Sequence, residues 1–531
     1  MQRTKRVLPV VVALVAVLIP QVLQGPAVVT AQQLFRVVVA QAEDAEDWDP
    51  PVAWNTAPEW IEQNAYDCLV FRNASGSRFE PKLAERWERV SDLVFRFHLR
   101  PNVRFHDGTP FTAEDIKYHY ERIKHGTREQ YIVQPQYQFF SEVLVRTPTT
   151  VDFLLPEPNT LILNLTSQTG CGVVSRAYHQ RVSRDVMHRN PMGTGPFRLR
   201  QWVKGERVVL EANRDYWGGK PEVDEFIFRI IPEPSTRLAE LLTGGVDVTY
   251  GLNVLDEARI RGNQRLRAVW APNNRGWMLF PRLRVNERYK GDPELDRRFL
   301  TEDPRIREAI ELAIDKYRLR DLVQRQGEAF RARLFQPLPE ANPALWGRRA
   351  NLYNPQRARE LLQEAGYRGQ RLVFHAPEQF AGLPAGDLAR AITQMLRDVG
   401  LNVDLRLLDT NTFNTQIYFP RRTQELILLN LGGNDNPFFG LSQFHTRIGW
   451  SPGGYGGASP RLDRLIDCAF QDVRDDARRL RCYHQASEII ADERFVIGLF
   501  QTYNLWGIRQ DISYTPRMDN YILGEDFKRR R

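Results

Sequence analysis

The sequence predicts an α/β protein built from two or three lobes. The chain has 531 residues, and the roughly 500 that follow an N-terminal apolar segment exceed what one hydrophobic core usually supports. From Arg371 onward, strand and helix patterns alternate: LVFHA, a helix over 387–399, NVDLRLL, a short helix and ELILLNL. This alternation is typical of a lobe whose strands are at least partly parallel.

The first 31 residues have the features of a secretory signal peptide. Three basic residues precede an apolar run from Val7 to Ile19, and small residues lie before Gln32. The run is shorter than the roughly 20 residues of a membrane-spanning helix, so an uncleaved anchor is the weaker interpretation. The first cysteine is Cys68, which leaves no lipid acceptor at the mature N-terminus. We expect a periplasmic protein, exported by a Sec-type signal, that is not a lipoprotein.

The net charge of +8 is concentrated at the two ends of the chain. Residues 1–31 carry three positive charges and the tail 528–531 carries four, which leaves the body close to neutral. The arginines are scattered among acidic residues and do not cluster with aromatic ones, so we expect no nucleic-acid partner. The tail itself is expected to be a solvated, frayed end.

Residues 94–126 predict a half-buried strand followed by a capped helix. VFRFHLR alternates apolar and polar side chains. Thr112 and Asp115 match a variant capping box, and Gly126 ends the helix. His106 and Asp107 lie in the turn between the two elements, with no nucleophile or metal ligand at recognisable spacing. We therefore expect this pair to be scaffold and not a catalytic site.

Three further blocks predict local structure. They are a hairpin with an aromatic loop over 193–219, a helix capped by Asp303 over 303–323, and a helix from Asn354 to Gly366.

The four cysteines favour disulfides in an exported protein. Two helices are predicted on either side of a turn at Asp475, with Cys468 seven residues before it and Cys482 seven after it. An antiparallel hairpin would bring this pair together, and its closure could add ~3 kcal/mol. Cys68 and Cys171 are then the remaining pair. Four buried thiols are the alternative.

Four blocks, in this order and spacing, resemble the extracellular solute-binding protein family 5. They are FHDGTPFTAEDI, GTGPFRL with EANRDYW, PRIREAIELAIDKYRL and YNPQRARELLQEAGY. That family supplies the periplasmic components of ABC importers for peptides, opines, glycans and nickel. The resemblance implies an α/β, two-lobed periplasmic-binding-protein-like fold (type II, class C) with an extra subdomain on the first lobe. It also implies a cleft that closes on its ligand.

The resemblance implies domain boundaries as well. Lobe I would comprise 34–70, 191–278 and 500–531, the appended subdomain 71–190, and lobe II 279–499. The hinges would lie near Trp277 and Phe500.

The function implied by the resemblance is non-enzymatic delivery of a solute to an ABC-type permease with a cytoplasmic ATPase. We expect a monomer without a cofactor, and no metal site because the nine histidines are dispersed. An exported hydrolase is the alternative from another class, although no G-x-S-x-G or H-E-x-x-H motif is present. A chemoreceptor partner or chaperone also stays open.

The ligand is where the sequence departs from the family pattern. Peptide-binding relatives often carry W-x-x-D-[YN]-x-D-P, whereas this chain has NLGGNDNP at 430–437. Gly433 then stands where the first aspartate would bind the amino group of a peptide. A buried ammonium without a counter-charge is costly, although Asp435 could substitute after a one-residue shift. We favour a small or oligopeptide-like, amino-bearing solute, with a neutral glycan or hydroxylated metabolite as the alternative.

Candidate ligand contacts are aromatic and polar residues on predicted loops, each with core packing or loop anchoring as the alternative role. They are Trp54, Asn55, Thr56 and Tyr66 in the first lobe, Trp277 at the crossover, and Asn434, Asp435, Asn436, Trp450 and Tyr455 in the second lobe.

Overall fold

The computed structural model describes most of the chain from Leu34 to Arg530. The described residues are 34–45, 47–52, 56–74, 78–127, 129–131, 133–159, 161–167, 169–283, 291–325, 351–380, 383, 385–418, 422, 424–431, 441, 444–445, 459–471 and 476–530. The elements below belong to one unit, Phe35–Arg531.

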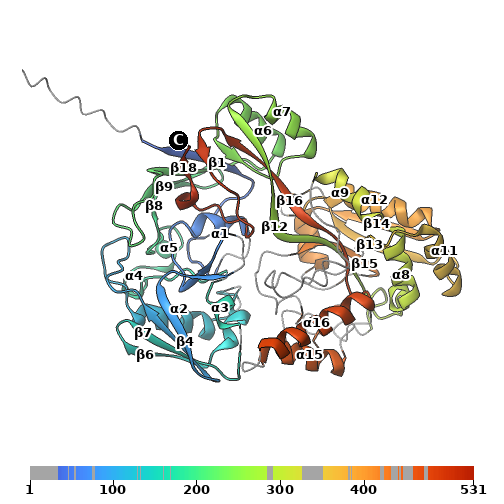
Figure 1. Ribbon diagram of the computed structural model, residues 1–531, viewed down its shortest axis with the longest axis horizontal. Coiled ribbons are helices and arrows are strands. Elements are labelled where there is room, and N and C mark those ends of the chain that lie inside the picture. Colours follow the sequence, from blue (N-terminus) through green and yellow to red (C-terminus); the bar gives the residue numbers. More distant parts are fainter. Residues whose placement is uncertain are drawn as a thin grey trace, which may run out of the picture. The chain divides into compact units, whose positions relative to one another are not determined.

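A ten-stranded mixed sheet runs through this unit in the order β14-β13-β15-β12-β16-β11-β1-β10-β9-β8 (Figure 1). The strands are β1 (Arg36–Gln41), β8 (Phe197–Val203), β9 (Arg207–Ala212), β10 (Glu225–Ile230), β11 (Val248–Thr249), β12 (Leu266–Pro281), β13 (Arg371–Pro377), β14 (Asn402–Leu408), β15 (Leu426–Leu431) and β16 (Ile497–Arg509). β13 runs parallel to β14 and β15, which confirms the parallel strands predicted after Arg371.

Two long strands, β12 and β16, join the two halves of this sheet. They pair antiparallel over most of their length, while β15 continues the sheet from β12 and β11 continues it from β16. Their register shifts between Pro272 and Gly276, and again between Trp277 and Met278. Such irregularities bend a strand locally and increase its twist. They lie where the crossing strands pass from one half of the sheet to the other.

Helices cover both faces of the sheet. They are α1 (Thr56–Glu62), α6 (Pro234–Thr243), α7 (Glu257–Arg261), α8 (Pro304–Ala313), α9 (Lys316–Val323), α11 (Pro355–Glu364), α12 (Ala385–Asp398), α15 (Pro460–Gln471) and α16 (Asp476–Asp492). Successive residues of a strand point to opposite faces. Leu505 of β16 accordingly belongs to the core that includes Leu241 of α6, whereas Trp506 belongs to the core that includes Ile61 of α1.

A second, antiparallel sheet lies within residues 84–154, in the order β4-β5-β7-β6. Its strands are β4 (Ala84–Ser91), β5 (Val94–Leu99), β6 (Glu142–Thr147) and β7 (Thr150–Leu154), and α2 (Ala113–His125) packs on it. The smaller elements are β2 (Val70–Arg72), β3 (Phe79–Pro81), η1 (Gln134–Phe139), α3 (Ile162–Leu165), α4 (Arg176–Arg181), α5 (Arg184–Met187), η2 (Val254–Asp256), η4 (Leu300–Glu302), α13 (Thr410–Thr412), η6 (Phe413–Tyr418), β17 (Ile512–Ser513), η7 (Gly524–Asp526) and β18 (Lys528–Arg529).

The predicted helix caps are confirmed. The backbone N–H of Thr112 donates to Asp115 Oδ2 at 2.9 Å and its hydroxyl donates at 3.2 Å, so α2 begins as the sequence predicts. Asn354 caps α11 by accepting the N–H of Arg357 at 3.1 Å. These caps are local because side chain and backbone lie within three residues of each other.

Two local predictions were wrong. Residues 303–323 form two helices, α8 and α9, because Asp315 caps the second one by accepting the N–H of Arg318 at 3.2 Å. The basic tail is not frayed, since β18 pairs with β17 and the N–H of Arg530 donates to the carbonyl of Asp511 at 2.8 Å.

Candidate functional site

Buried amide side chains gather where β12, β15 and β16 run together. Asn430 is fully buried, and its Nδ2 donates to Thr502 Oγ1 at 2.7 Å. Gln501 Nε2 donates to the carbonyl of Asn273 at 3.1 Å, and Asn273 Oδ1 accepts the N–H of Arg275 at 2.9 Å. The register shifts of β12 interrupt the regular ladder here, and the side-chain amides supply partners for its backbone groups. We call these five residues the crossover cluster.

Gln324, the first residue after α9, completes the edge of β16 beside this cluster. Its Nε2 donates to the carbonyl of Gln501 at 2.6 Å, and its Oε1 accepts the N–H of Tyr503 at 3.1 Å. Two such bonds to alternate residues of a strand reproduce the pairing made by a neighbouring strand. The buried amide of Gln324 therefore fixes the end of α9 to the crossing strand.

Arg275 adds a guanidinium to the crossover cluster. Its Nη1 donates to the carbonyl of Asn430 at 3.2 Å. Burial lowers the pKa of Arg275, while Glu43 acts in the opposite direction. A guanidinium has five N–H donors, so it can bind a carbonyl or carboxylate in addition to Asn430. Sequence reasoning missed this residue and its neighbours, although a run of polar residues at 273–275 inside a strand is an available signal.

Most of the predicted ligand residues lie outside the described residues. These are Trp54, Asn55, Asn434, Asp435, Asn436, Trp450 and Tyr455, together with the side chain of Thr56. The described part fixes where their segments attach. Thr56 begins α1, and Asn430 and Leu431 are the last residues of β15. The segment with Asn434, Asp435 and Asn436 therefore continues from the strand that carries Asn430.

Tyr66 and Trp277 are the two predicted contacts whose side chains are described, and both are buried. The hydroxyl of Tyr66 donates to the carbonyl of Trp48 at 2.6 Å, and burial raises the pKa of Tyr66 well above its usual range. Trp277 belongs to the core that includes residues of α8, α11 and α12. Both side chains pack in cores here, and a ligand contact by either stays a prediction.

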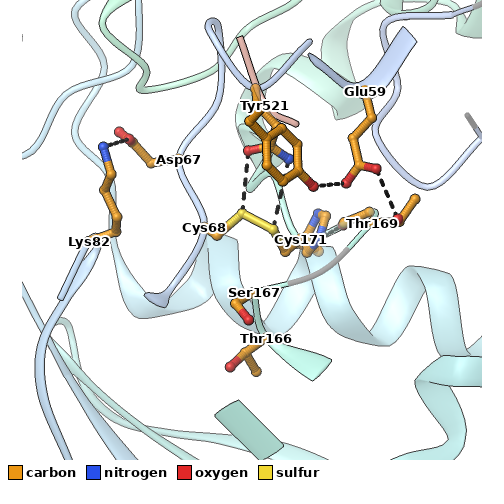
Figure 2. The surroundings of a disulfide bond; sticks show 12 residues. Glu59, Asp67, Cys68, Lys82, Thr166, Ser167, Thr169, Cys171 and Tyr521 are labelled. Carbon is orange, nitrogen blue, oxygen red and sulfur yellow. Dashed lines mark hydrogen bonds and ion pairs between the residues drawn. A yellow bond between two sulfur atoms is a disulfide. The ribbon is translucent and has the colours of Figure 1, made fainter. Parts of the chain in front are cut away.

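The helix α1 is held in place by a disulfide and by buried hydrogen bonds (Figure 2). Glu59 of α1 accepts the hydroxyl of Tyr521 at 2.5 Å and that of Thr169 at 3.0 Å. The bond between Cys68 and Cys171 lies beside this pair of contacts. It confirms the second predicted pairing, and Cys468 bonded to Cys482 confirms the first. The segment that follows Trp54 and Asn55 is thereby tied to distant parts of the chain.

Asp67 secures the aromatic loop predicted at the end of 193–219. Its carboxylate accepts from the hydroxyl of Tyr216, the Nε1 of Trp217 and the hydroxyl of Thr194, each at 2.9 Å. Burial raises the pKa of Asp67, although the ammonium of Lys82, 3.7 Å away, acts in the opposite direction. All of these groups bind one another, so the cluster is scaffold.

His106 occupies a structural position. Its backbone N–H donates to the carbonyl of Gly193 at 2.9 Å, and its Nε2 lies 3.0 Å from the carbonyl of Gly195. Burial lowers the pKa of His106 to about 4. The ring is therefore neutral at pH 7 and donates its proton from Nε2 to that carbonyl. Asp107 accepts the hydroxyl of Thr109 at 2.6 Å and shapes the turn.

Two searches of the described residues bear on the class of site. Within them, no three His, Cys, Asp or Glu side chains come close enough to hold a metal ion. Among their helices, none is both long and apolar enough to cross a membrane.

Comparison with known proteins identifies the family. The family model of the bacterial extracellular solute-binding proteins, family 5 (middle region), matches residues 78–448. The chain belongs to this family. A dipeptide-binding protein of Escherichia coli (strain K12) is 29% identical over 327 residues, which are 57% of this chain and 57% of that protein. The alignment therefore spans just over half the length of this relative.

Two further family 5 relatives match over longer stretches. A probable D,D-dipeptide-binding periplasmic protein of Escherichia coli (strain K12) is 24% identical over 489 residues, 88% of each chain. The periplasmic binding protein DppA of Helicobacter pylori, solved with the peptide STSA, has a TM-score of 0.76 at 21% identity and covers 94% of this chain and 99% of its own. At this identity the likeness establishes the fold. The solved relatives are two-lobed α/β binding proteins, which confirms the predicted fold class.

Proposed function

We propose that this chain captures a peptide-like or other amino-bearing solute between two lobes and delivers it to an ABC importer. The observation that carries the proposal is the crossing of β12 and β16. These strands join the two halves of the sheet and hold a buried polar cluster where they cross. The dipeptide-binding relatives of the family support the choice of ligand class.

The lobes of the proposal follow the boundaries given by the sequence: 34–70, 191–278 and 500–531 in lobe I, 71–190 in its subdomain, and 279–499 in lobe II. Closure requires a ligand that binds the closed state more tightly than the open one, so contacts must come from both lobes. We assign Trp54, Asn55, Thr56 and Tyr66 to lobe I and Asn434, Asp435 and Asn436 to lobe II, with Trp277, Trp450 and Tyr455 as further candidates.

Asp435 is the proposed anchor for the ligand's ammonium group. It is the only carboxylate in NLGGNDNP, in which Gly433 replaces the aspartate of the family motif. Arg275 is the proposed partner for a ligand carbonyl or carboxylate, because its guanidinium bonds to Asn430 on the same strand from which the Asp435 segment continues. The two charges together suit a zwitterionic solute.

The alternative ligand is a neutral glycan or hydroxylated metabolite. Gly433 favours it because the expected counter-charge is absent from its usual place. The amides of the crossover cluster suit hydroxyl groups as well as peptide groups.

Export and partners complete the proposal. Residues 1–31 act as a Sec-type signal peptide, and the mature protein works in the periplasm as a monomer without a lipid anchor. It transfers its ligand to a permease with a cytoplasmic ATPase and catalyses no reaction. A hydrolase would convert a bound peptide into fragments, which mass spectrometry of the recovered ligand would reveal.

Calorimetric titration of the mature protein decides between the ligand classes. Panels of short peptides and of oligosaccharides are compared for the wild type and for Asp435→Asn. We expect saturable binding of peptides with a free amino group, weakened by several kcal/mol in Asp435→Asn. Tight binding of a neutral sugar that Asp435→Asn leaves unchanged would contradict the charge anchor and support the alternative.

A further inference from the structure

A cavity of about 530 Å³ lies beside β16 on the face opposite Tyr66. Its lining includes Leu252 and Leu255 on one wall, Leu322 on another, and Tyr503 and Leu505 of β16. Leu505 packs with α6 and α7, whereas its neighbour Trp506 packs in the core that contains Tyr66. The cavity is therefore separate from the crossover cluster's contacts with that core. Its volume lies within the roughly 300–1,000 Å³ of small-ligand sites.

The cavity lies along an uncovered stretch of the β16 edge. Gln324 binds the edge at Gln501 and Tyr503, and Asp247 accepts the N–H of Arg509 at 2.8 Å farther along the same edge. Because alternate residues of a strand point their N–H and C=O groups the same way, the backbone of Leu505 faces this edge too. β11 ends its pairing at Gly507, and no described residue pairs with Leu505 there.

The walls of the cavity are apolar and carry excess negative charge. Leu255 is 77% exposed and Leu322 is 49% exposed, which is unusual for large apolar side chains that lie at the same cavity. Asp256, Asp321 and Asp387 also line it, against the single guanidinium of Arg325. An apolar side chain would be accommodated between the leucines, while an acidic one would be repelled.

We propose that this cavity binds a short extended peptide that pairs with the free edge of β16 at Leu505. The N–H and C=O of Leu505 would bond to one peptide unit, as when a strand is added to a sheet edge, and an apolar side chain would contact Leu255 and Leu322. This site is separate from the proposed interlobe site and does not require the ligand to carry a free amino group.

The probe is acetyl-Ala-Leu-Ala-amide, whose blocked ends lack the charges proposed to bind Asp435 and Arg275. Calorimetry and hydrogen exchange on the mature protein are used together. We expect saturable binding with slower exchange of the Leu505 amide. An analogue with an ester in place of the leucine N–H should bind about fivefold more weakly because it lacks the donor, and acetyl-Ala-Asp-Ala-amide should bind at least about tenfold more weakly.

Paired variants locate the site. Leu255→Ser with Leu322→Ser should weaken the binding of acetyl-Ala-Leu-Ala-amide at least about tenfold. The matched control is Val90→Ser with Leu93→Ser, which changes two similarly exposed apolar residues, at 49% and 44% exposed, on the turn between β4 and β5. No saturable binding, no protection of Leu505, or equal affinity in both double variants would overturn the proposal. Binding that depends on Asp435 would place the probe in the interlobe site, so it would overturn this inference and leave the proposed function standing.

Discussion

Trp277 of β12 and Phe500 of β16 are direct partners in the antiparallel pair, and both side chains are buried. Trp277 also pairs with Asn430 of β15, and the register of β12 shifts immediately after it. The sequence-based hinges fall at these same two residues. We expect closure of the lobes to bend the sheet at this pair, because a register shift is where a strand changes direction most easily.

Replacement of Gln324 should destabilise the crossing. Gln324→Leu removes two hydrogen bonds and leaves the carbonyl of Gln501 and the N–H of Tyr503 buried without them. The free energy of unfolding should fall by about 2–4 kcal/mol, measured by urea denaturation. Gln363→Leu on the exposed side of α11 is the matched control and should change it by less than about 0.5 kcal/mol. A Gln324→Leu variant as stable as this control would show that the amide does not support β16.

The buried histidine of β13 should make stability depend on pH. Burial, with Arg406 acting in the same direction, lowers the pKa of His375 to about 4, below its ordinary value of 6.5. Between these values the unfolded chain binds a proton that the folded protein excludes, so stability falls as the pH is lowered. From pH 7 to pH 5 the wild type should lose about 2 kcal/mol more than His375→Gln. His125→Gln, at an exposed position of α2, should keep the wild-type dependence. Identical pH profiles for wild type and His375→Gln would refute the assignment.

The two disulfides should contribute unequally to stability. Cys468 and Cys482 are 14 residues apart, whereas Cys68 and Cys171 are 103 apart. On the chain-entropy account, loops of these sizes stabilise by about 3 and about 4.7 kcal/mol. Paired Cys→Ala variants, compared by denaturant unfolding, should follow this order. Non-reducing peptide mapping of protein from its native compartment should recover both bonds, and free thiols at Cys468 and Cys482 would contradict the pairing.

His106 should be dispensable for ligand binding. Because its contacts are to the carbonyls of the neighbouring loop, His106→Ala should keep ligand affinity within about threefold, a change under ~1 kcal/mol. Affinity is measured in a preparation that melts like the wild type. A large loss of affinity in such a preparation would show that His106 contacts the ligand.

The features that the sequence predicts well are those set by near neighbours. Thr112 and Asp115, or Asn354 and Arg357, interact within three residues, so their pattern is visible in a short window. Asp315 carries the same kind of signal, but the isoleucine periodicity across it favours a single helix. Local signals therefore failed only where two of them competed.

The crossover could not be predicted in the same way. Gln324 and Gln501 are 177 residues apart, and Asn430 and Thr502 are 72 apart, so nothing local relates them. The polar run at 273–275 has low strand propensity, although it lies inside β12. The family resemblance supplied the hinge positions, while most of the predicted ligand residues stay predictions because they lie outside the described residues.

Closure about Trp277 and Phe500 is the central claim, and a distance measurement tests it most directly. Spin labels at Val90→Cys and Tyr353→Cys, two exposed positions assigned to different lobes, report the separation between lobes with and without a bound free-amino peptide. We predict a shorter and narrower distance distribution with the peptide, and no such change in Asp435→Asn at the same peptide concentration. An unchanged distribution in the wild type at a peptide concentration that calorimetry shows to be saturating would contradict the account.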